Sequence, residues 1–271
     1  MGKRADRRYL VEQAYHDASG LTARASLYEH QDPRIDLVAE VLRFAGPVAG
    51  RTVADVGCGN GRYVDACAAA GADVVAIDLS AGMLAAVTPS HRRRVAADAQ
   101  RLPLAGGSVD VVLLLHMLYH VPDPAVALAE ARRVLRAGGR VVVATNGRRH
   151  LAEMDKLWVP ILRDLGVEGA LEDVGLVNSR FDGDDAHALV ASTFATVESE
   201  VLASQVVVTD PAPVVRHAAS TTGAVVAREQ ANDAVDRFER AVVDVLRRDG
   251  ELRITTEVVV VRGDDRDGAG G

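Results

Sequence analysis

Three glycines at alternate positions link an apolar, strand-like segment to a helix-like one. The segment 51–56 has the pattern of a short strand, and Gly57, Gly59 and Gly61 follow it directly. Such glycines let the backbone turn sharply and approach a ligand, with free N–H groups at the start of the next helix. A dinucleotide-binding turn would need its third glycine at position 62, where this chain has Arg62. The spacing therefore predicts a ligand-binding turn that is not built for a pyrophosphate.

Strand-like and helix-like segments alternate from residue 51 to residue 145. The predicted strands cover 51–56, 73–78, 95–98, 109–117 and 140–145, and the predicted helices cover 62–70, 81–87 and 125–136. The run 109–117 is rich in Val and Leu, as expected for a strand that is buried on both faces. Alternation at this spacing predicts right-handed βαβ units and a parallel sheet covered by helices.

The later part of the chain is less regular. The segments 150–165 and 224–248 have the pattern of amphipathic helices, while 196–209 and 251–261 are rich in β-branched residues. We expect the last two segments to be strands that pair antiparallel at one edge of the sheet.

These patterns favour one large domain rather than two. The domain would cover 51–262, with helical inserts near 150–182 and 211–250 that form a lid. A helical N-terminal segment, 1–50, would cover the ligand site. The acidic, glycine-rich end, 263–271, is expected to be a disordered tail.

Composition and charge exclude several classes of protein. With 48% hydrophobic and 25% charged residues, the 271-residue chain is typical of a globular protein. Two cysteines are too few for a disulfide framework or a common four-ligand zinc site. A net charge of −7 disfavours a nucleic-acid partner. The charged start argues against a signal peptide, and the apolar run 111–121 is too short to span a bilayer. We therefore expect a soluble, cytoplasmic protein with no membrane partner.

Acidic residues stand near the ends of the first three predicted strands. These are Asp55, Asp78 and Asp98. Because the carboxyl ends of parallel strands meet at one edge of a sheet, the three carboxylates are expected to line one crevice. Asp78 could accept hydrogen bonds from both hydroxyls of a ribose, since Ser80 already provides the cap of the next helix. Asp98 could accept a bond from an adenine amino group, or it could be an exposed loop residue.

In combination, these segments resemble the motifs of the class I S-adenosylmethionine-dependent methyltransferases. The five motif-like segments are 53–63, 74–83, 97–104, 108–122 and 134–147. The segment 15–24 and the sequence HMLYHV at 116–121 are similar to those of a bacterial, small-molecule type of this family. The resemblance, which extends over 51–157, implies a Rossmann-like α/β fold. It implies a sheet of about seven strands, parallel with an antiparallel edge pair, with helices on both faces and helical lid insertions.

The resemblance also implies S-adenosylmethionine as cofactor and S-adenosylhomocysteine as its product. The glycines would lie against the methionine part, with Asp55 near its ammonium group and Asp78 on the ribose. Leu79 and Met83 would pack on the adenine. Arg24 could pair with the cofactor's carboxylate, or it could be a surface residue of an N-terminal helix. The implied cofactor-binding set is Arg24, Asp55, Gly57, Cys58, Gly59, Gly61, Asp78, Leu79, Met83, Asp98, Ala99 and His116.

Polar aromatic residues just beyond the fourth predicted strand are the candidates for chemistry. Methyl transfer from a sulfonium mainly requires holding acceptor and methyl group in line, and a base only where the acceptor must lose a proton. His120 is the preferred base, with Tyr119 and His116 beside it, although His120 could equally orient a loop. His116 and His120 have a helical metal spacing but no third ligand, so no metal is expected. The candidate acceptor contacts are Tyr15, His120, Asn146 and His150.

These features favour S-adenosylmethionine-dependent methyl transfer to a small organic acceptor, such as a secondary metabolite. The alternatives are a methyltransferase that acts on RNA or protein, a repurposed member that binds the cofactor without methyl transfer, and a nicotinamide enzyme. The acceptor, the choice among O-, N- and C-methylation and the oligomeric state, monomer or homodimer, are left open.

Overall fold

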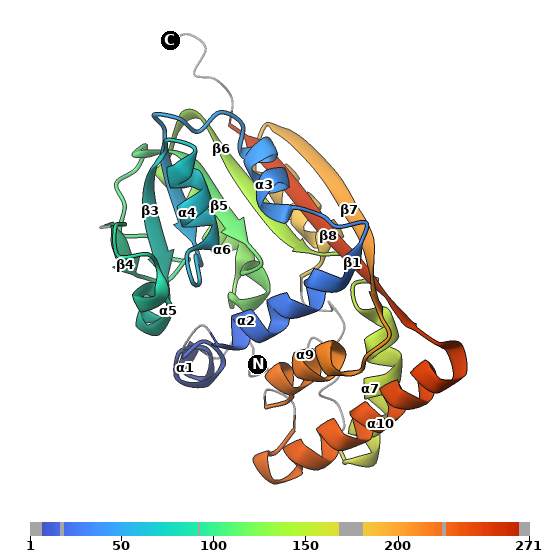
Figure 1. The fold of residues 1–271 in the computed structure, drawn as a ribbon. Coiled ribbons are helices and arrows are strands. Elements are labelled where there is room, and N and C mark those ends of the chain that lie inside the picture. Colours follow the sequence, from blue (N-terminus) through green and yellow to red (C-terminus); the bar gives the residue numbers. More distant parts are fainter. Residues whose placement is uncertain (1–6, 17–18, 92, 168–180, 224–225, 266–271) are drawn as a thin grey trace.

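One mixed sheet organises the molecule. The computed structural model describes residues 7–16, 19–91, 93–167, 181–223 and 226–265. Within these ranges, eight strands run in the order β1-β7-β8-β6-β5-β2-β3-β4 (Figure 1). The predicted α/β fold class is confirmed, with eight strands instead of about seven.

Five strands make up the parallel half of the sheet. In spatial order they are β4 (Arg94–Ala96), β3 (Asp73–Asp78), β2 (Thr52–Val56), β5 (Val109–Leu115) and β6 (Leu135–Asn146). The helices between them are α4 (Arg62–Ala69), α5 (Ala81–Ala86) and α6 (Pro124–Val134). Side-chain caps fix where α5 and α6 begin: Ser80 accepts the N–H of Met83, and Asp123 accepts that of Ala125.

Three of the boundaries that differ from the prediction in this half have a clear structural reason. β5 ends at Leu115 because His116 turns the chain with a φ of 53°. β4 ends at Ala96, so Asp98 lies in the following loop and does not end the strand. β6 begins at Leu135, earlier than predicted, because Leu135 already pairs with β5 ahead of a register shift.

The other edge of the sheet is antiparallel. β8 (Leu252–Asp264) lies between β6 and β7 (Thr196–Val208) and is antiparallel to both, which confirms the predicted edge pair. The extra strand, β1 (Gln31–Asp32), pairs with β7 and is too short for a periodic pattern to predict. The predicted tail is wrong at positions 263 and 264, which continue β8, while 266–271 lies outside the described residues.

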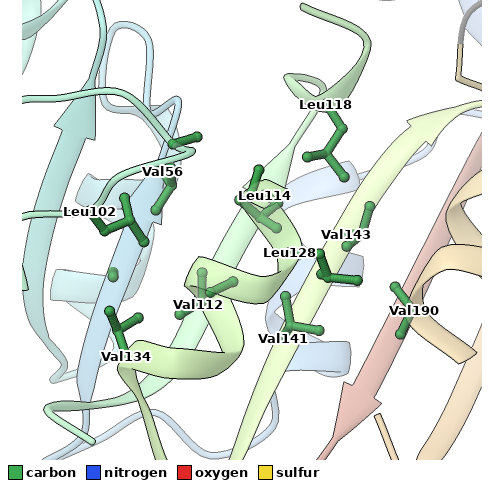
Figure 2. Packing of buried hydrophobic residues seen from close by; sticks show 14 of the residues in the cluster. Val56, Leu102, Val112, Leu114, Leu118, Leu128, Val134, Val141, Val143 and Val190 are labelled. Carbon is green, nitrogen blue, oxygen red and sulfur yellow. The ribbon is translucent and has the colours of Figure 1, made fainter. Parts of the chain in front are cut away.

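Helices cover both faces of the sheet. On one face, α3 (Leu37–Ala45) and α4 pack against β2 and its neighbours. On the other face, α6 and α8 (Gly183–Thr193) pack against β5, β6 and β8. Figure 2 shows Leu128 of α6 in this second layer, with Val112 of β5 and Val141 of β6. The helix α8 has no counterpart among the predicted elements.

A further group of helices lies beyond the carboxyl ends of the parallel strands (Figure 1). It comprises α1 (Arg7–Tyr9), the π-helix η2 (Leu10–Ala14), α2 (Ser19–Ala25), the 3-10 helices η3 (Ser26–His30) and η5 (Arg228–Gln230), α7 (Ala152–Asp164), α9 (Ala212–Thr222) and α10 (Ala231–Asp249). One apolar cluster, which includes Leu27, Trp158 and Phe238, joins η3, α7, α9 and α10. None of the described helices is long and apolar enough to cross a membrane.

The insert regions differ in detail from the predicted helices. The predicted helix 224–248 corresponds to η5 and α10, and α9 precedes it as a separate helix. Residues 168–180 of the insert near 150–182, and residues 224 and 225, lie outside the described residues.

Candidate active site

The glycine-rich turn after β2 opens into a cavity of about 790 Å³. The cavity lies at the carboxyl ends of β2, β3, β5 and β6, where parallel α/β sheets bind their ligands. Its walls come from the N-terminal helices and from α7, α9 and α10. The 3-10 helix η4 (Leu118–His120), which follows β5, also contributes to the cavity wall.

The turn depends on glycine at two positions in particular. Gly57 and Gly59 have φ values of 73° and 54°, a region that side chains rarely adopt. A Cβ atom on Gly57 would lie 2.8 Å from Cβ of Met117. The N–H groups of Gly57 and Cys58 both donate to the carbonyl oxygen of Ile77, at 2.8 and 3.0 Å. The turn is therefore fixed against the neighbouring strand β3.

Asp78 connects this turn to the next strand. It ends β3, and its carboxylate accepts the N–H of Gly59 at 2.9 Å and that of Ser80 at 2.8 Å. Burial raises the pKa of Asp78, while the backbone N–H groups of Ser80, Gly59 and Leu79 act in the opposite direction. The carboxylate lines the cavity with lone pairs left for a hydroxyl-bearing ligand.

Asp55 is a buried carboxylate with an unsatisfied atom. Its side chain is 1% exposed, and Oδ2 has no hydrogen-bond partner among the described residues. Burial, together with the nearby charge of Asp78, raises the pKa of Asp55 to about 7. Because a buried charge needs a partner, an unpaired carboxylate on a cavity wall marks a place for a cationic ligand group.

Arg24 is the complementary feature on the N-terminal side. Its guanidinium lies over the ring of Tyr15, 5.4 Å from the centroid, and Nη2 is buried with no hydrogen-bond partner among the described residues. An anionic ligand group near Arg24 would satisfy the N–H of Nη2.

Asp98 lies in the loop after β4. Its carboxylate accepts the N–H of Gln100 at 2.9 Å and pairs with Arg7 across 3.3 Å at the cavity rim.

Tyr15, Tyr119 and His120 form an aromatic cluster on the wall. The Tyr15 hydroxyl lies 2.7 Å from Nε2 of His120, and the ring of Tyr119 meets that of His120 edge to face. His116 has a different environment, since burial and the positive charge of Arg62 lower its pKa to about 4. His116 is therefore neutral at physiological pH.

His150 lies where β6 leads into α7. Its Nε2 is 2.9 Å from the hydroxyl of Tyr28, and its Nδ1 accepts the N–H of Glu257 at 3.1 Å. Burial lowers the pKa of His150 to about 3. Asn146, the last residue of β6, also lines the cavity.

The structure brings nearly all of the predicted site residues to this one cavity. The exception is Gly61, whose missing side chain would face Val87, and which begins α4 in a left-handed conformation. The residues along the cavity wall are Tyr15, Arg24, Asp55, Gly57, Cys58, Gly59, Asp78, Leu79, Met83, Asp98, Ala99, His116, Tyr119, His120, Asn146 and His150. Among the described residues, no group of three or more His, Cys, Asp or Glu side chains is arranged to hold a metal ion.

Sequence patterns missed several residues of the cavity. Tyr28, Met154, His217 and Phe238 line it, yet none stands in a recognisable motif. Trp158 packs against Phe238, with ring centroids 4.8 Å apart, and it also lines the cavity.

Comparison with known proteins identifies the family of the chain. Residues 54–143 match the family model of the methyltransferase domain. Over 188 residues the chain is 30% identical to a demethylmenaquinone methyltransferase of Paenarthrobacter aurescens, covering 62% of this chain and 70% of the relative. A demethylmenaquinone methyltransferase of Renibacterium salmoninarum is 37% identical over 44% of this chain and 57% of its own length. A ubiquinone biosynthesis O-methyltransferase of Methylococcus capsulatus is 39% identical over 37% of this chain and 46% of its own length. The chain thus spans about half the length of these last two relatives.

Solved structures share the fold at low identity. A protein of Anabaena variabilis, assigned as a methyltransferase from an antibiotic biosynthesis pathway, superimposes with a TM-score of 0.62 at 19% identity, over 83% of this chain and 95% of that one. The [4+2]-cyclase SpnF superimposes with a TM-score of 0.52 at 19% identity, over 85% of this chain and 81% of that one.

Fold, site and relatives together define the class of protein. The chain belongs to the class I S-adenosylmethionine-dependent methyltransferases. The cofactor of this family has an ammonium group, a carboxylate and a ribose, and these match the unpaired Oδ2 of Asp55, the unpaired Nη2 of Arg24 and the carboxylate of Asp78.

Proposed function

We propose that the chain transfers a methyl group from S-adenosylmethionine to a small organic acceptor bound in the same cavity. The observation that carries the proposal is the buried carboxylate of Asp55, which lies on the cavity wall with one oxygen unsatisfied. Such an atom costs free energy unless a ligand completes it, and the ammonium group of the cofactor has the required charge and donors.

The residues around Asp55 provide the remaining contacts in this proposal. Asp78 accepts hydrogen bonds from the ribose hydroxyls, and Arg24 pairs with the carboxylate. Asp98 accepts a bond from the adenine amino group. The apolar side chains that would pack against the adenine ring are Leu79, Met83 and Ala99.

Bound S-adenosylmethionine supplies an electrophilic methyl group on a positively charged sulfur. The chain then holds the acceptor in line with that group and excludes water, which are the main requirements of a displacement with so good a leaving group. Where the acceptor is a hydroxyl, the Tyr15–His120 pair takes up its proton at Nε2 of His120. Where the acceptor has no proton to lose, the pair only orients it.

The cavity and the relatives both support a small organic acceptor. The wall contributed by α7 and α10 contains Met154, Trp158 and Phe238, which suits an apolar organic molecule better than a polymer. The relatives are named as a demethylmenaquinone methyltransferase and a ubiquinone biosynthesis O-methyltransferase, and the chain spans only part of their length. We propose a small organic acceptor of this general kind.

Calorimetric titration of the purified protein tests the proposal. S-adenosylmethionine and S-adenosylhomocysteine should each bind one site, and the variant Asp78→Ala should lose most of the affinity. Absence of binding heat from protein shown to be folded would overturn the proposal.

A screen of phenols, quinols and amines, read by mass spectrometry for a gain of one methyl group, tests the transfer step. Cofactor binding without a methylated product across that screen would favour a repurposed, non-methylating member.

A further inference from the structure

One polar pair lies beside apolar residues in the cavity wall. We call this part of the wall the acceptor chamber and define it by Tyr28, His150, Met154, Trp158 and Phe238. Its polar pair is the hydroxyl of Tyr28 and Nε2 of His150, 2.9 Å apart. The two rings stack at an interplanar angle of 24°.

The backbone around His150 is held firmly against β8. Gly147 donates its N–H to the carbonyl oxygen of Glu257 at 3.0 Å, and Leu151 donates to that of Thr255 at 2.8 Å. Leu151 adopts a φ of 61°, an unusual conformation for this residue type that the flanking bonds maintain. The carboxylate of Glu153 accepts the N–H of Thr255 at 2.8 Å. The ring of His150 is therefore presented on a rigid support.

The hydrogen bonds of His150 determine which of its nitrogens carries the proton. Nδ1 accepts the backbone N–H of Glu257 at 3.1 Å, so Nδ1 cannot itself be protonated. Burial lowers the pKa of His150 to about 3, so the ring is neutral at physiological pH. The single ring proton is on Nε2, which donates to the hydroxyl oxygen of Tyr28.

This arrangement leaves the proton of Tyr28 for a ligand. The hydroxyl already accepts from His150, and its own O–H is directed to no other described side chain. Burial raises the pKa of Tyr28, with Arg24 acting in the opposite direction, so the hydroxyl stays protonated. Tyr28 is thus a neutral donor of fixed orientation in a buried part of the cavity wall, where a hydrogen bond is stronger than in water.

We propose that Tyr28 binds a carbonyl or hydroxyl oxygen of a neutral, apolar ring compound, and that this contact selects the methyl acceptor. The inference rests on the proposed methyl transfer and specifies the acceptor of that site. A cationic amine offers no lone pair to the Tyr28 proton, whereas a ketone or phenol does. The rings of Trp158 and Phe238 and the side chain of Met154 provide surface for the apolar part of such a molecule.

The test uses 1-tetralone, a neutral two-ring ketone, as the probe. Trp158 is the only tryptophan of the chain, so its fluorescence reports occupancy of the acceptor chamber. We expect 1-tetralone to change this fluorescence in the full-length protein saturated with S-adenosylhomocysteine. The variant Tyr28→Phe should weaken the probe's Kd roughly three- to tenfold, the range for one hydrogen bond. Tyr63→Phe makes the same chemical change within α4, at a position of the same cavity that does not belong to the acceptor chamber, and should leave the Kd unchanged.

An infrared measurement separates a direct contact from a structural role. A hydrogen bond to the ketone lowers its carbonyl stretching frequency, so the bound probe should absorb at lower frequency in the wild type than in Tyr28→Phe. Equal frequencies, an unchanged Kd in Tyr28→Phe, or no response of Trp158 to the probe would each overturn this inference. Calorimetric binding of S-adenosylhomocysteine is measured alongside. Its loss in the wild type would instead contradict the proposed function, and its retention in Tyr28→Phe shows that the variant is folded.

Discussion

The hydroxyl of Tyr15 and Nε2 of His120 lie 2.7 Å apart, although 105 positions separate them in the chain. Their rings meet at an interplanar angle of 75°. The carbonyl oxygen of Tyr15 accepts a hydrogen bond from Oγ of Ser80 at 2.8 Å, which fixes the residue against the start of α5. This contact joins the N-terminal segment to the loop after β5, so a base at His120 depends on a residue far away in sequence.

The first prediction concerns this pair. With a hydroxyl acceptor, His120→Ala should lower kcat by at least about a hundredfold, because general-base catalysis typically contributes that much. Tyr15→Phe should have a smaller effect, since it removes only the group that orients the ring. Because the two side chains act as a unit, the double variant should be little worse than His120→Ala. Steady-state rates at saturating cofactor measure this.

Two controls accompany the measurement. S-adenosylhomocysteine affinity should stay within a few-fold of the wild type in all three variants, and Tyr63→Phe should retain the wild-type kcat. Strictly additive losses in the double variant would show that Tyr15 and His120 do not work together.

The second prediction is a pH dependence of stability that originates at Asp55. Its pKa is raised from 3.8 to about 7 by burial and by Asp78. Between these values the folded chain keeps a proton that the unfolded chain has released, so the free energy of unfolding falls as pH rises through this window. The shift corresponds to about 4 kcal/mol once both states are ionised.

Asp55→Asn removes this titration. In denaturant unfolding without cofactor, the variant should gain stability over the wild type progressively between about pH 4 and pH 7, with no further gain above that range. A stability difference that does not vary with pH would contradict the raised pKa.

The third prediction applies the same carboxylate to cofactor binding. Only the ionised form of Asp55 attracts an ammonium group, so S-adenosylhomocysteine affinity should rise with pH and level off above about pH 7. Below that point it should fall up to about tenfold per pH unit, as expected when binding releases one proton. Titrations from about pH 5.5 to 8 measure the slope. Asp55→Asn should bind weakly with a flat profile, and a flat profile in the wild type would remove Asp55 from the ammonium site.

The cofactor side of the cavity could be predicted from sequence because its residues lie at strand ends. Asp55 and Asp78 each close a predictable strand, and parallel pairing places both at one edge of the sheet. The sequence does not predict that Asp98 lies in a loop, because β4 is only three residues long and no clear pattern marks its end.

Most of the acceptor chamber could not be predicted in this way. The contact between Tyr28 and His150 joins residues 122 positions apart, through a 3-10 helix and a loop with no periodic signal. Trp158 belongs to a buried apolar cluster, and only the three-dimensional arrangement shows that it also lines the cavity. The two-residue strand β1 is likewise set by tertiary contact, through its pairing with β7.

The last prediction separates two reasons for glycine at position 57. Gly57 and Gly50 have nearly the same positive φ, 73° and 71°, so an alanine is strained by a similar amount at each. A Cβ at Gly57 would also lie 2.8 Å from Cβ of Met117, while nothing lies within 4 Å of a Cβ at Gly50. We therefore expect Gly50→Ala to cost about 1–2 kcal/mol of unfolding free energy. Gly57→Ala should cost a further 1–3 kcal/mol, roughly, through overpacking. Only Gly57→Ala should also weaken S-adenosylhomocysteine binding, because the displaced turn carries Gly59 away from Asp78. Denaturant unfolding and calorimetry of the two variants measure both effects, and equal losses of stability and affinity would show that backbone strain alone explains the glycine.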